Sequence, residues 1–77
     1  MRTVIKGTKS IKEYKEVRDR MEYGAVKAYE AHQNACETWT HGDIDRVWYD
    51  HDNILCVQYN DGNWWHYRHA ANGIEWW

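Results

Sequence analysis

The sequence predicts an α+β fold, in which a long or broken N-terminal helix packs on a three- to four-stranded antiparallel β-meander. Two patterns lead to this prediction. Up to residue 39, apolar or small side chains recur every three or four positions, which is the spacing of one helix face. After Gly42, short runs rich in aromatic and β-branched residues alternate with turn sequences, as antiparallel strands do. The 77 residues are expected to form one domain, with an arm or short strand over 1–9, a helical region over 10–41 and the meander over 43–77.

The helix is expected to begin directly after Ser10. In the sequence Ser10-Ile11-Lys12-Glu13 the serine hydroxyl can accept a hydrogen bond from the Glu13 amide while the Glu13 carboxylate reaches back, which is a capping box. A continuous helix over 11–39 is about 43 Å long, whereas a compact domain of this size is roughly 30 Å across. The helix therefore either breaks near Tyr23-Gly24 or packs its excess length against a second copy of the chain. The sequence favours self-association.

Strands are expected over 44–49, 54–59 and 64–69, with a terminal strand over 74–77 and a short first strand over 3–6. Asp61-Gly62 is a two-residue hairpin signal that sets Tyr59 opposite Trp64, and a four-residue loop over 50–53 sets Tyr49 opposite Ile54. This register places Val47, Tyr49, Ile54, Cys56, Trp65 and Tyr67 on one face, and Trp48, Leu55, Val57, Tyr59, Trp64 and His66 on the other. Since one helical layer covers one face, the other is left for a partner or for a second copy of the chain.

The aromatic composition is typical of a binding surface. The chain has six Trp and six Tyr but no Phe, and Trp and Tyr are favoured where one end of the ring is packed and the other meets water or a partner. The sequence therefore predicts a non-enzymatic protein-binding module, expected to be a homodimer. The expected partner-binding residues are a set of ring side chains with an acidic rim: Trp48, Tyr59, Trp64, His66, Trp76 and Trp77, with Asp43, Asp45, Asp50, Asp52 and Asp61.

The charge distribution favours a protein partner over nucleic acid. The net charge is −2, but residues 1–20 hold seven basic and three acidic side chains, and residues 21–77 hold three and nine. An acidic surface repels nucleic acid and can occupy the phosphate sites of a nucleic-acid-binding protein. The first alternative is a single-stranded nucleic-acid-binding protein, which stacks bases on the Trp and Tyr rings and uses a basic patch of Lys6, Lys9, Lys12 and Lys15. The second is a structural homo-oligomer.

No residue pattern predicts catalysis, a metal ion or a cofactor. His32 and Cys36 share a helix face, but a cysteine among alanines is typical of a small core residue. The His and Cys residues lack the spacing of metal-binding motifs, and the acidic loop after Tyr49 lacks the glycine and distal glutamate of a calcium loop. A polar N-terminus without a long apolar run predicts a cytoplasmic protein with reduced cysteines and no membrane segment.

One segment resembles a known kind of protein. The run from Val47-Trp48-Tyr49-Asp50 through Asn60-Asp61-Gly62-Asn63-Trp64-Trp65-His66-Tyr67, about a third of the chain, is similar to the strand, turn, strand unit of small phage and mobile-element proteins, which include anti-CRISPR inhibitors. The resemblance implies a short, acidic, non-enzymatic inhibitor. Such a protein acts in the host cytoplasm and blocks a nuclease effector by occupying its nucleic-acid or regulatory surface. No functional residues carry over from the resemblance.

Overall fold

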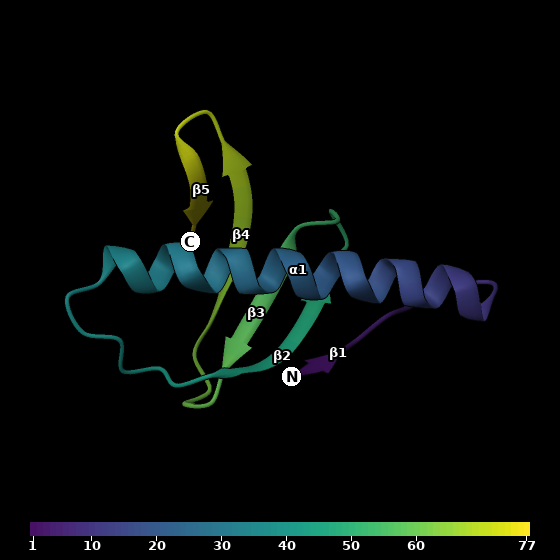
Figure 1. The fold of residues 1–77 in the computed structure, drawn as a ribbon, viewed down its shortest axis with the longest axis horizontal. Coiled ribbons are helices and arrows are strands. Elements are labelled where there is room, and N and C mark those ends of the chain that lie inside the picture. The colour runs from purple at the N-terminus through teal and green to yellow at the C-terminus, as the bar shows by residue number, and fades with distance from the viewer.

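The computed structural model describes residues 1–77 and has one helix packed on one face of a five-stranded mixed sheet (Figure 1). The elements are β1 (Arg2–Thr3), α1 (Ile11–Ala35), β2 (Ile44–Tyr49), β3 (Leu55–Tyr59), β4 (Trp64–Ala70) and β5 (Gly73–Trp76). The predicted α+β fold is confirmed. The sheet has one strand more than the predicted meander, because β1 pairs in parallel with β2 at its edge while all other pairs are antiparallel.

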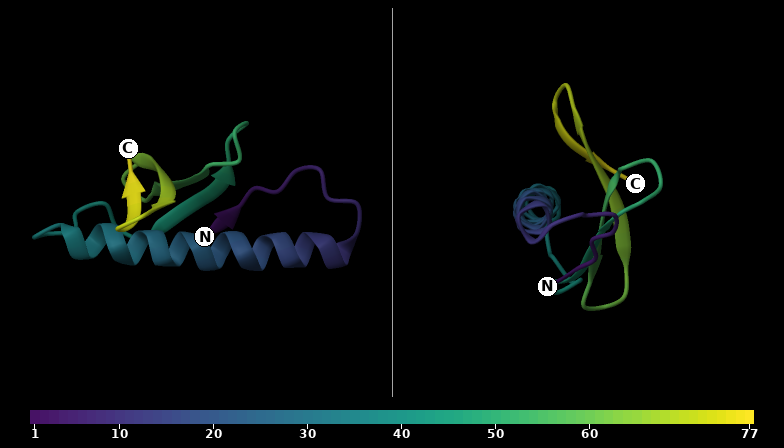
Figure 2. Two further views of the ribbon diagram at one scale, coloured as in Figure 1. Left: turned by 90° about the horizontal axis from the view of Figure 1, so that it is seen from above. Right: turned by 90° about the vertical axis from the view of Figure 1, so that its right-hand side faces the viewer.

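The start of α1 follows the predicted capping box. The Ser10 hydroxyl accepts a hydrogen bond from the Glu13 amide at 3.1 Å, and the Glu13 carboxylate accepts one from the Lys9 amide at 3.0 Å. The helix then runs through Gly24 without a break, so the alternative of a split helix is wrong. At about 1.5 Å per residue it is about 37 Å long, and it extends past the sheet at both ends along the 42 Å axis of the molecule (Figures 1 and 2).

The end of α1 lies earlier than predicted. The sequence predicts helix to residue 41, but the backbone of Cys36 is extended, with φ −103° and ψ 140°, and the helix ends at Ala35. Beyond this point Trp39 packs in the core from outside the helix. Its ring lies edge-on to Tyr29 and Tyr59, with centroid distances of 5.6 and 5.0 Å, and its indole N–H donates to the Gly42 carbonyl at 2.7 Å.

Both central hairpins have three-residue loops, which differs from the predicted two- and four-residue loops. In the β3–β4 loop, the Gly62 amide donates to the Tyr59 carbonyl at 2.9 Å and the Tyr59 amide donates to the Asn63 carbonyl at 2.9 Å. The β2–β3 loop repeats this pattern from Asp50 to Ile54. The third loop residue has a left-handed backbone in each case, φ 90° at Gly62 and 61° at Asn53, as in a type I turn followed by a G1 bulge.

These loops move β3 by one position relative to the predicted register. The observed pairs include Tyr49 with Leu55 and Cys56 with His66. Since side chains alternate between the two faces of a strand, a slip of one residue exchanges the faces of β3. The predicted face assignments of this strand are therefore wrong. The side chains that pack with α1 are Val47, Leu55, Val57, Tyr59, Trp65, Tyr67, Ile74 and Trp76, against Met21, Ala25 and Ala28 of the helix.

A chain of hydrogen bonds crosses the core between helix and sheet. The His32 Nδ1 lies 2.7 Å from the Tyr67 hydroxyl, which lies 2.7 Å from the Tyr59 hydroxyl, and at most 5% of any of the three residues is exposed. The His32 ring also stacks on Trp76 at a centroid distance of 4.4 Å. Burial, and then the nearby His41, lower the pKa of His32 below its usual value. These bonds satisfy polar atoms that would otherwise be costly to bury.

Replacing Gly24 by Ala should stabilise the protein. A Cβ at this position would lie 3.5 Å from Leu55 Cδ2, which is ordinary van der Waals contact. Because alanine favours the helix over glycine, we expect Gly24→Ala to raise the free energy of unfolding by about 0.5–1 kcal/mol in urea titrations. The matched control is Gly62→Ala, which should destabilise because φ there is 90°. A loss of stability in Gly24→Ala would contradict a continuous helix.

Protonation of His32 should weaken the fold as the pH falls. With a folded-state pKa below the unfolded value of about 6.5, the unfolded chain takes up the proton more readily. The contribution of neutral His32 to the free energy of unfolding is therefore fully present above a pH of about 6.5. It declines as the pH falls from there through the lower folded-state pKa. His32→Gln should flatten this decline in thermal unfolding curves, whereas the exposed control His51→Gln should keep it. Equal slopes in wild type and His32→Gln would count against this role.

Candidate binding surface

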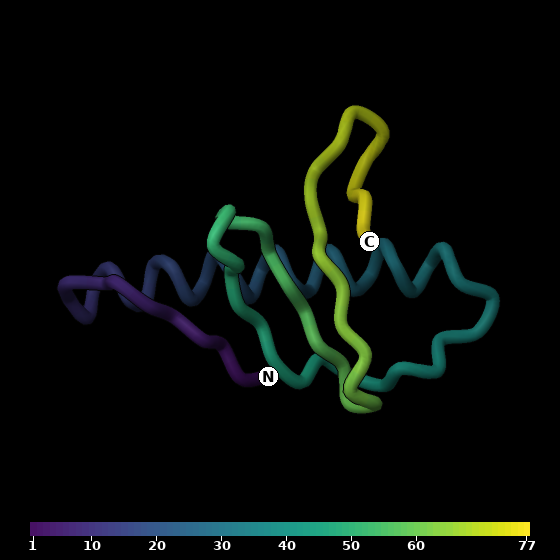
Figure 3. Tube along the Cα trace, turned by 180° about the vertical axis from the view of Figure 1, so that it is seen from behind, coloured from purple at the N-terminus to yellow at the C-terminus, as the bar shows by residue number.

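The helix α1 covers one face of the sheet and leaves the other uncovered (Figures 2 and 3). The uncovered face carries a row of ring side chains. We call Trp48, Trp64, His66 and Trp77 the Trp–His strip. Neighbouring rings are in contact: the centroids of Trp48 and Trp64 lie 5.5 Å apart, those of Trp64 and His66 5.0 Å, and those of His66 and Trp77 5.0 Å with planes only 6° apart. Trp77 follows β5, and its amide and carbonyl both bond to the backbone of His66.

An arginine stacks at each end of the Trp–His strip. The Arg46 guanidinium lies 4.3 Å from the Trp48 ring centroid, and that of Arg68 lies 5.0 Å from the Trp77 ring. Arg68 also pairs with Glu75 on the neighbouring strand. Trp64 is 48% exposed and Trp77 is 51% exposed. The strip therefore offers two large, half-exposed indoles between two planar cations.

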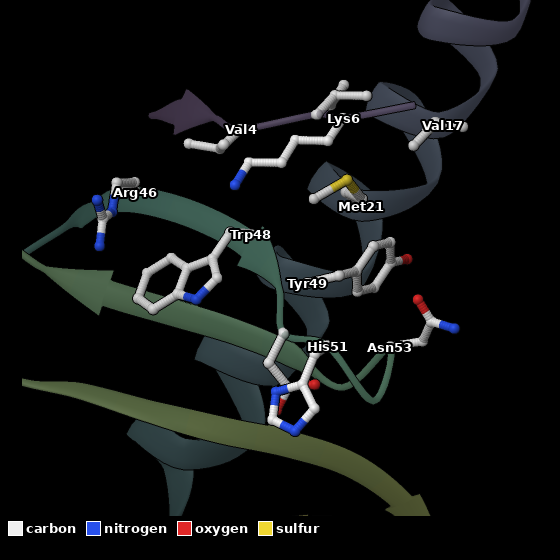
Figure 4. Close-up of a pocket in the computed structure, with 11 residues that line it drawn as sticks. Val4, Lys6, Val17, Met21, Arg46, Trp48, Tyr49, His51 and Asn53 are labelled. Atoms are coloured by element: carbon white, nitrogen blue, oxygen red, sulfur yellow. The ribbon is translucent and has the colours of Figure 1, made fainter. Parts of the chain in front are cut away.

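A pocket of about 480 Å³ lies beside the Arg46 end of the strip, between the segment 4–6, α1 and the β2–β3 loop (Figure 4). Its polar lining includes Lys6, Arg46, His51 and the carboxylate Asp50, and its apolar lining includes Trp48 and Met21. The Lys6 side chain extends across the opening toward Arg46 and Trp48 (Figure 4). The buried Nε of Arg46 has no hydrogen-bond acceptor within the chain. The pocket therefore presents the cationic side chains of Lys6 and Arg46 next to the Asp50 carboxylate.

The acidic residues expected to rim this surface mostly stabilise turns. Asp50 Oδ1 accepts hydrogen bonds from the amides of Ile54 and Asp52 at 3.0 and 2.8 Å, and the Ile54 bond is the main cause that lowers the pKa of Asp50. Asp61 lies 2.6 Å from His41 Nδ1, and this contact lowers the pKa of Asp61.

Of the predicted rim residues, Asp50 borders the strip, since its Oδ2 lies 3.8 Å from His66 Nε2. Asp45 pairs with Arg2 at 3.3 Å, while Asp43 and Asp52 are exposed on loops. The carboxylates are thus distributed along the loops and the sheet edge.

Two of the predicted aromatic anchors lie on the other face. Tyr59 is completely buried in the core, and Trp76 packs on His32 beneath α1. Neither can contact a partner at the uncovered face, because β3 is shifted by one residue and Trp76 alternates with Trp77. Of the predicted basic patch, only Lys6 lies beside the strip. Lys9 precedes α1, and Lys12 and Lys15 belong to it.

Three residues of the candidate site, Arg46, Arg68 and Cys56, were not predicted from the sequence. Arg46 and Arg68 are two residues from Trp48 and His66 along their strands, and this spacing of two could have placed them on the strip. The predicted register places Cys56 on the same face as Trp65 and Tyr67, but it lies opposite His66 on the uncovered face. Burial, and then the Asp50 carboxylate, raise the pKa of the Cys56 thiol to about 11. The loop types at Asn53 and Gly62 are the signal that would have corrected its position.

The chain matches no protein-family model, no curated protein and no solved structure. Its helix lacks the combination of length and apolar character needed to cross a bilayer. The function is therefore inferred from the residues of this chain.

Proposed function

We propose that this protein is a non-enzymatic binding module that captures a protein partner on the Trp–His strip and in the adjoining pocket. The observation that carries this proposal is the pair of half-exposed indoles, Trp64 and Trp77, on the face of the sheet that α1 does not cover. Trp and Arg are the residues most enriched at the energetic centres of protein interfaces. Here the two types lie in one contiguous row.

The charges around the strip define the chemistry of the partner. Lys6 and Arg46 line the pocket at one end, and the Arg46 Nε has no acceptor within the chain. A carboxylate that entered the pocket could form charge-assisted hydrogen bonds with these two side chains. The partner is accordingly a protein surface with an apolar centre, which covers the indoles, and an acidic side chain beside it.

The reactive groups of the chain support binding rather than catalysis. Cys56 is completely buried, and its raised pKa keeps it a thiol at neutral pH. His32 is bonded to Tyr67 and enclosed by Trp39, Trp65 and Trp76, so its ring has no access to a substrate. The tyrosine hydroxyls in the core are bonded to each other.

Single-stranded nucleic acid is the second candidate. Bases stack on exposed aromatic rings, and Lys6 and Arg46 could contact a phosphate beside Trp48. Against it stand the acidic side chains of Asp43 and Asp52 on loops and of Asp45 on β2, and the pairing of Arg68 with Glu75. These charges favour the protein partner.

Two finer expectations stay predictions. That the partner is a nuclease effector follows only from the resemblance to anti-CRISPR inhibitors. That the chain forms a homodimer is supported by exposed apolar side chains on α1, where Ile11 is 76% and Tyr23 is 68% exposed. Light scattering of the protein alone determines its oligomeric state.

Selection of peptides from a random library on the immobilised protein tests the proposal. We expect binders with Asp or Glu next to aromatic or aliphatic residues. Trp64→Ala should weaken them by about 2 kcal/mol, roughly 30-fold, because it removes an exposed indole from the centre of the strip. Tyr23→Ala, which removes an exposed ring from α1, is the matched control and should bind as wild type does.

Two results would contradict this function. One is a set of peptides that bind Trp64→Ala and wild type equally well. The other is a protein that selects no peptide but whose tryptophan fluorescence is quenched by a single-stranded oligonucleotide in a salt-dependent way, which would favour the nucleic-acid alternative.

A further inference from the structure

We propose that Asp50, Cys56 and His66 form a zinc-binding site on the uncovered side of the sheet, beside the Trp–His strip. The three residues come from the β2–β3 loop, β3 and β4, and the fold brings them together through the register of β3. Their carboxylate oxygen, sulfur and ring nitrogen atoms all lie within 4.8 Å of one another. The site is independent of the partner proposed above, since it needs only residues of this chain.

The distances suit a small tetrahedral ion. Bond lengths of zinc to sulfur, nitrogen and oxygen place neighbouring ligand atoms about 3.3–3.6 Å apart. Asp50 Oδ2 already lies 3.8 Å from His66 Nε2, and Cys56 is the direct cross-strand neighbour of His66. A contraction of about 1 Å, within reach of side-chain rotation, closes the set around one ion.

Neighbouring groups already orient two of the three ligands. His66 Nδ1 lies 3.3 Å from the Trp77 carbonyl oxygen, and when Nδ1 donates its proton there, the lone pair of Nε2 faces Asp50. Asp50 Oδ1 is held by the amides of Asp52 and Ile54, which leaves Oδ2 toward His66. A histidine that donates its other ring N–H to a carbonyl is the usual support of a metal ligand.

The donor atoms select zinc over other common divalent ions. Calcium and magnesium prefer sites built of oxygen, whereas zinc accepts one sulfur, one nitrogen and one oxygen ligand. On binding, the Cys56 thiol loses its proton to the solvent and a zinc–sulfur bond forms, so the thiolate and the Asp50 carboxylate together balance the two positive charges. The fourth position is left to water or to a group of a partner. The side chains of Asp50 and His66 are 20% and 27% exposed, so the ion reaches the buried Cys56 along them.

Such an ion would join the β2–β3 loop to two strands. It would fix Asp50 against His66, and His66 stacks on Trp77 of the strip. A domain of this size buries a small core, and a bound metal stabilises the folded state by mass action. The expected consequences are zinc-dependent stability and a more rigid strip.

Titration of the reduced, full-length protein with zinc chloride, in competition with a chromophoric chelator, tests this site. We expect one ion per chain, and with cobalt(II) a thiolate-to-metal charge-transfer band in the near ultraviolet. Cys56→Ser, His66→Gln and Asp50→Asn should each weaken binding, by about 100-fold or more for Cys56 and His66. Cys36→Ser and His69→Gln are matched controls, because neither residue belongs to the cluster, and both should bind as wild type does.

The variants keep the test decisive. Cys56 is buried, so Cys56→Ser is read together with near-ultraviolet circular dichroism, and His66→Gln and Asp50→Asn alter partly exposed side chains. Three results would overturn the proposal. The first is no zinc binding by wild type, and the second is a folded Cys56→Ser variant that binds zinc as tightly as wild type and gives the same cobalt charge-transfer band. The third is a loss of zinc affinity in Cys36→Ser or His69→Gln as large as that in the cluster variants.

Discussion

The register of β3 is the constraint on which the rest of this structure depends. It is set by two residues, Asn53 and Gly62, whose left-handed backbones close three-residue loops at the two ends of the strand. Because side chains alternate along a strand, this register decides which residues meet the helix and which face away from it. It sends Val57 and Tyr59 into the core, and it places Cys56 between Trp48 and His66 on the other face.

One helix for a sheet with two faces explains the unusual composition. The face beneath α1 uses Tyr59, Tyr67 and His32 as core residues, and their polar atoms satisfy one another. The opposite face has no covering layer, and there Trp64 and Trp77 remain half exposed between two arginines. The absence of Phe thus has two causes: a core built around hydroxyl and imidazole groups, and a surface built of indoles. The composition by itself indicated only the second.

Local signals in the sequence predicted the elements, whereas their exact pairing needed tertiary information. The start of α1 could be read from Ser10 and Glu13, since a capping box acts within four residues. The end of α1 could not be read from the sequence. It depends on Trp39, which packs on Tyr29 of the helix and on Tyr59 of β3, and these contacts are tertiary. Asp61-Gly62 indicated a hairpin correctly, but the loop length was one residue short. That single residue moved Tyr59 and Cys56 between faces, and with them part of the candidate site.

Nuclear magnetic resonance measurement of the β3–β4 register tests the central claim most directly. Tyr59 and Asn63 form a hydrogen-bonded pair, so Gln58 with Trp64 and Cys56 with His66 are non-hydrogen-bonded pairs, whose Cα atoms lie only about 4.5 Å apart. We predict strong Hα–Hα cross-peaks within these two pairs in the nuclear Overhauser spectrum. Cross-peaks that instead join Tyr59 to Trp64, or Val57 to His66, would show a two-residue loop and would contradict the uncovered Trp–His strip and the placement of Cys56 beside it.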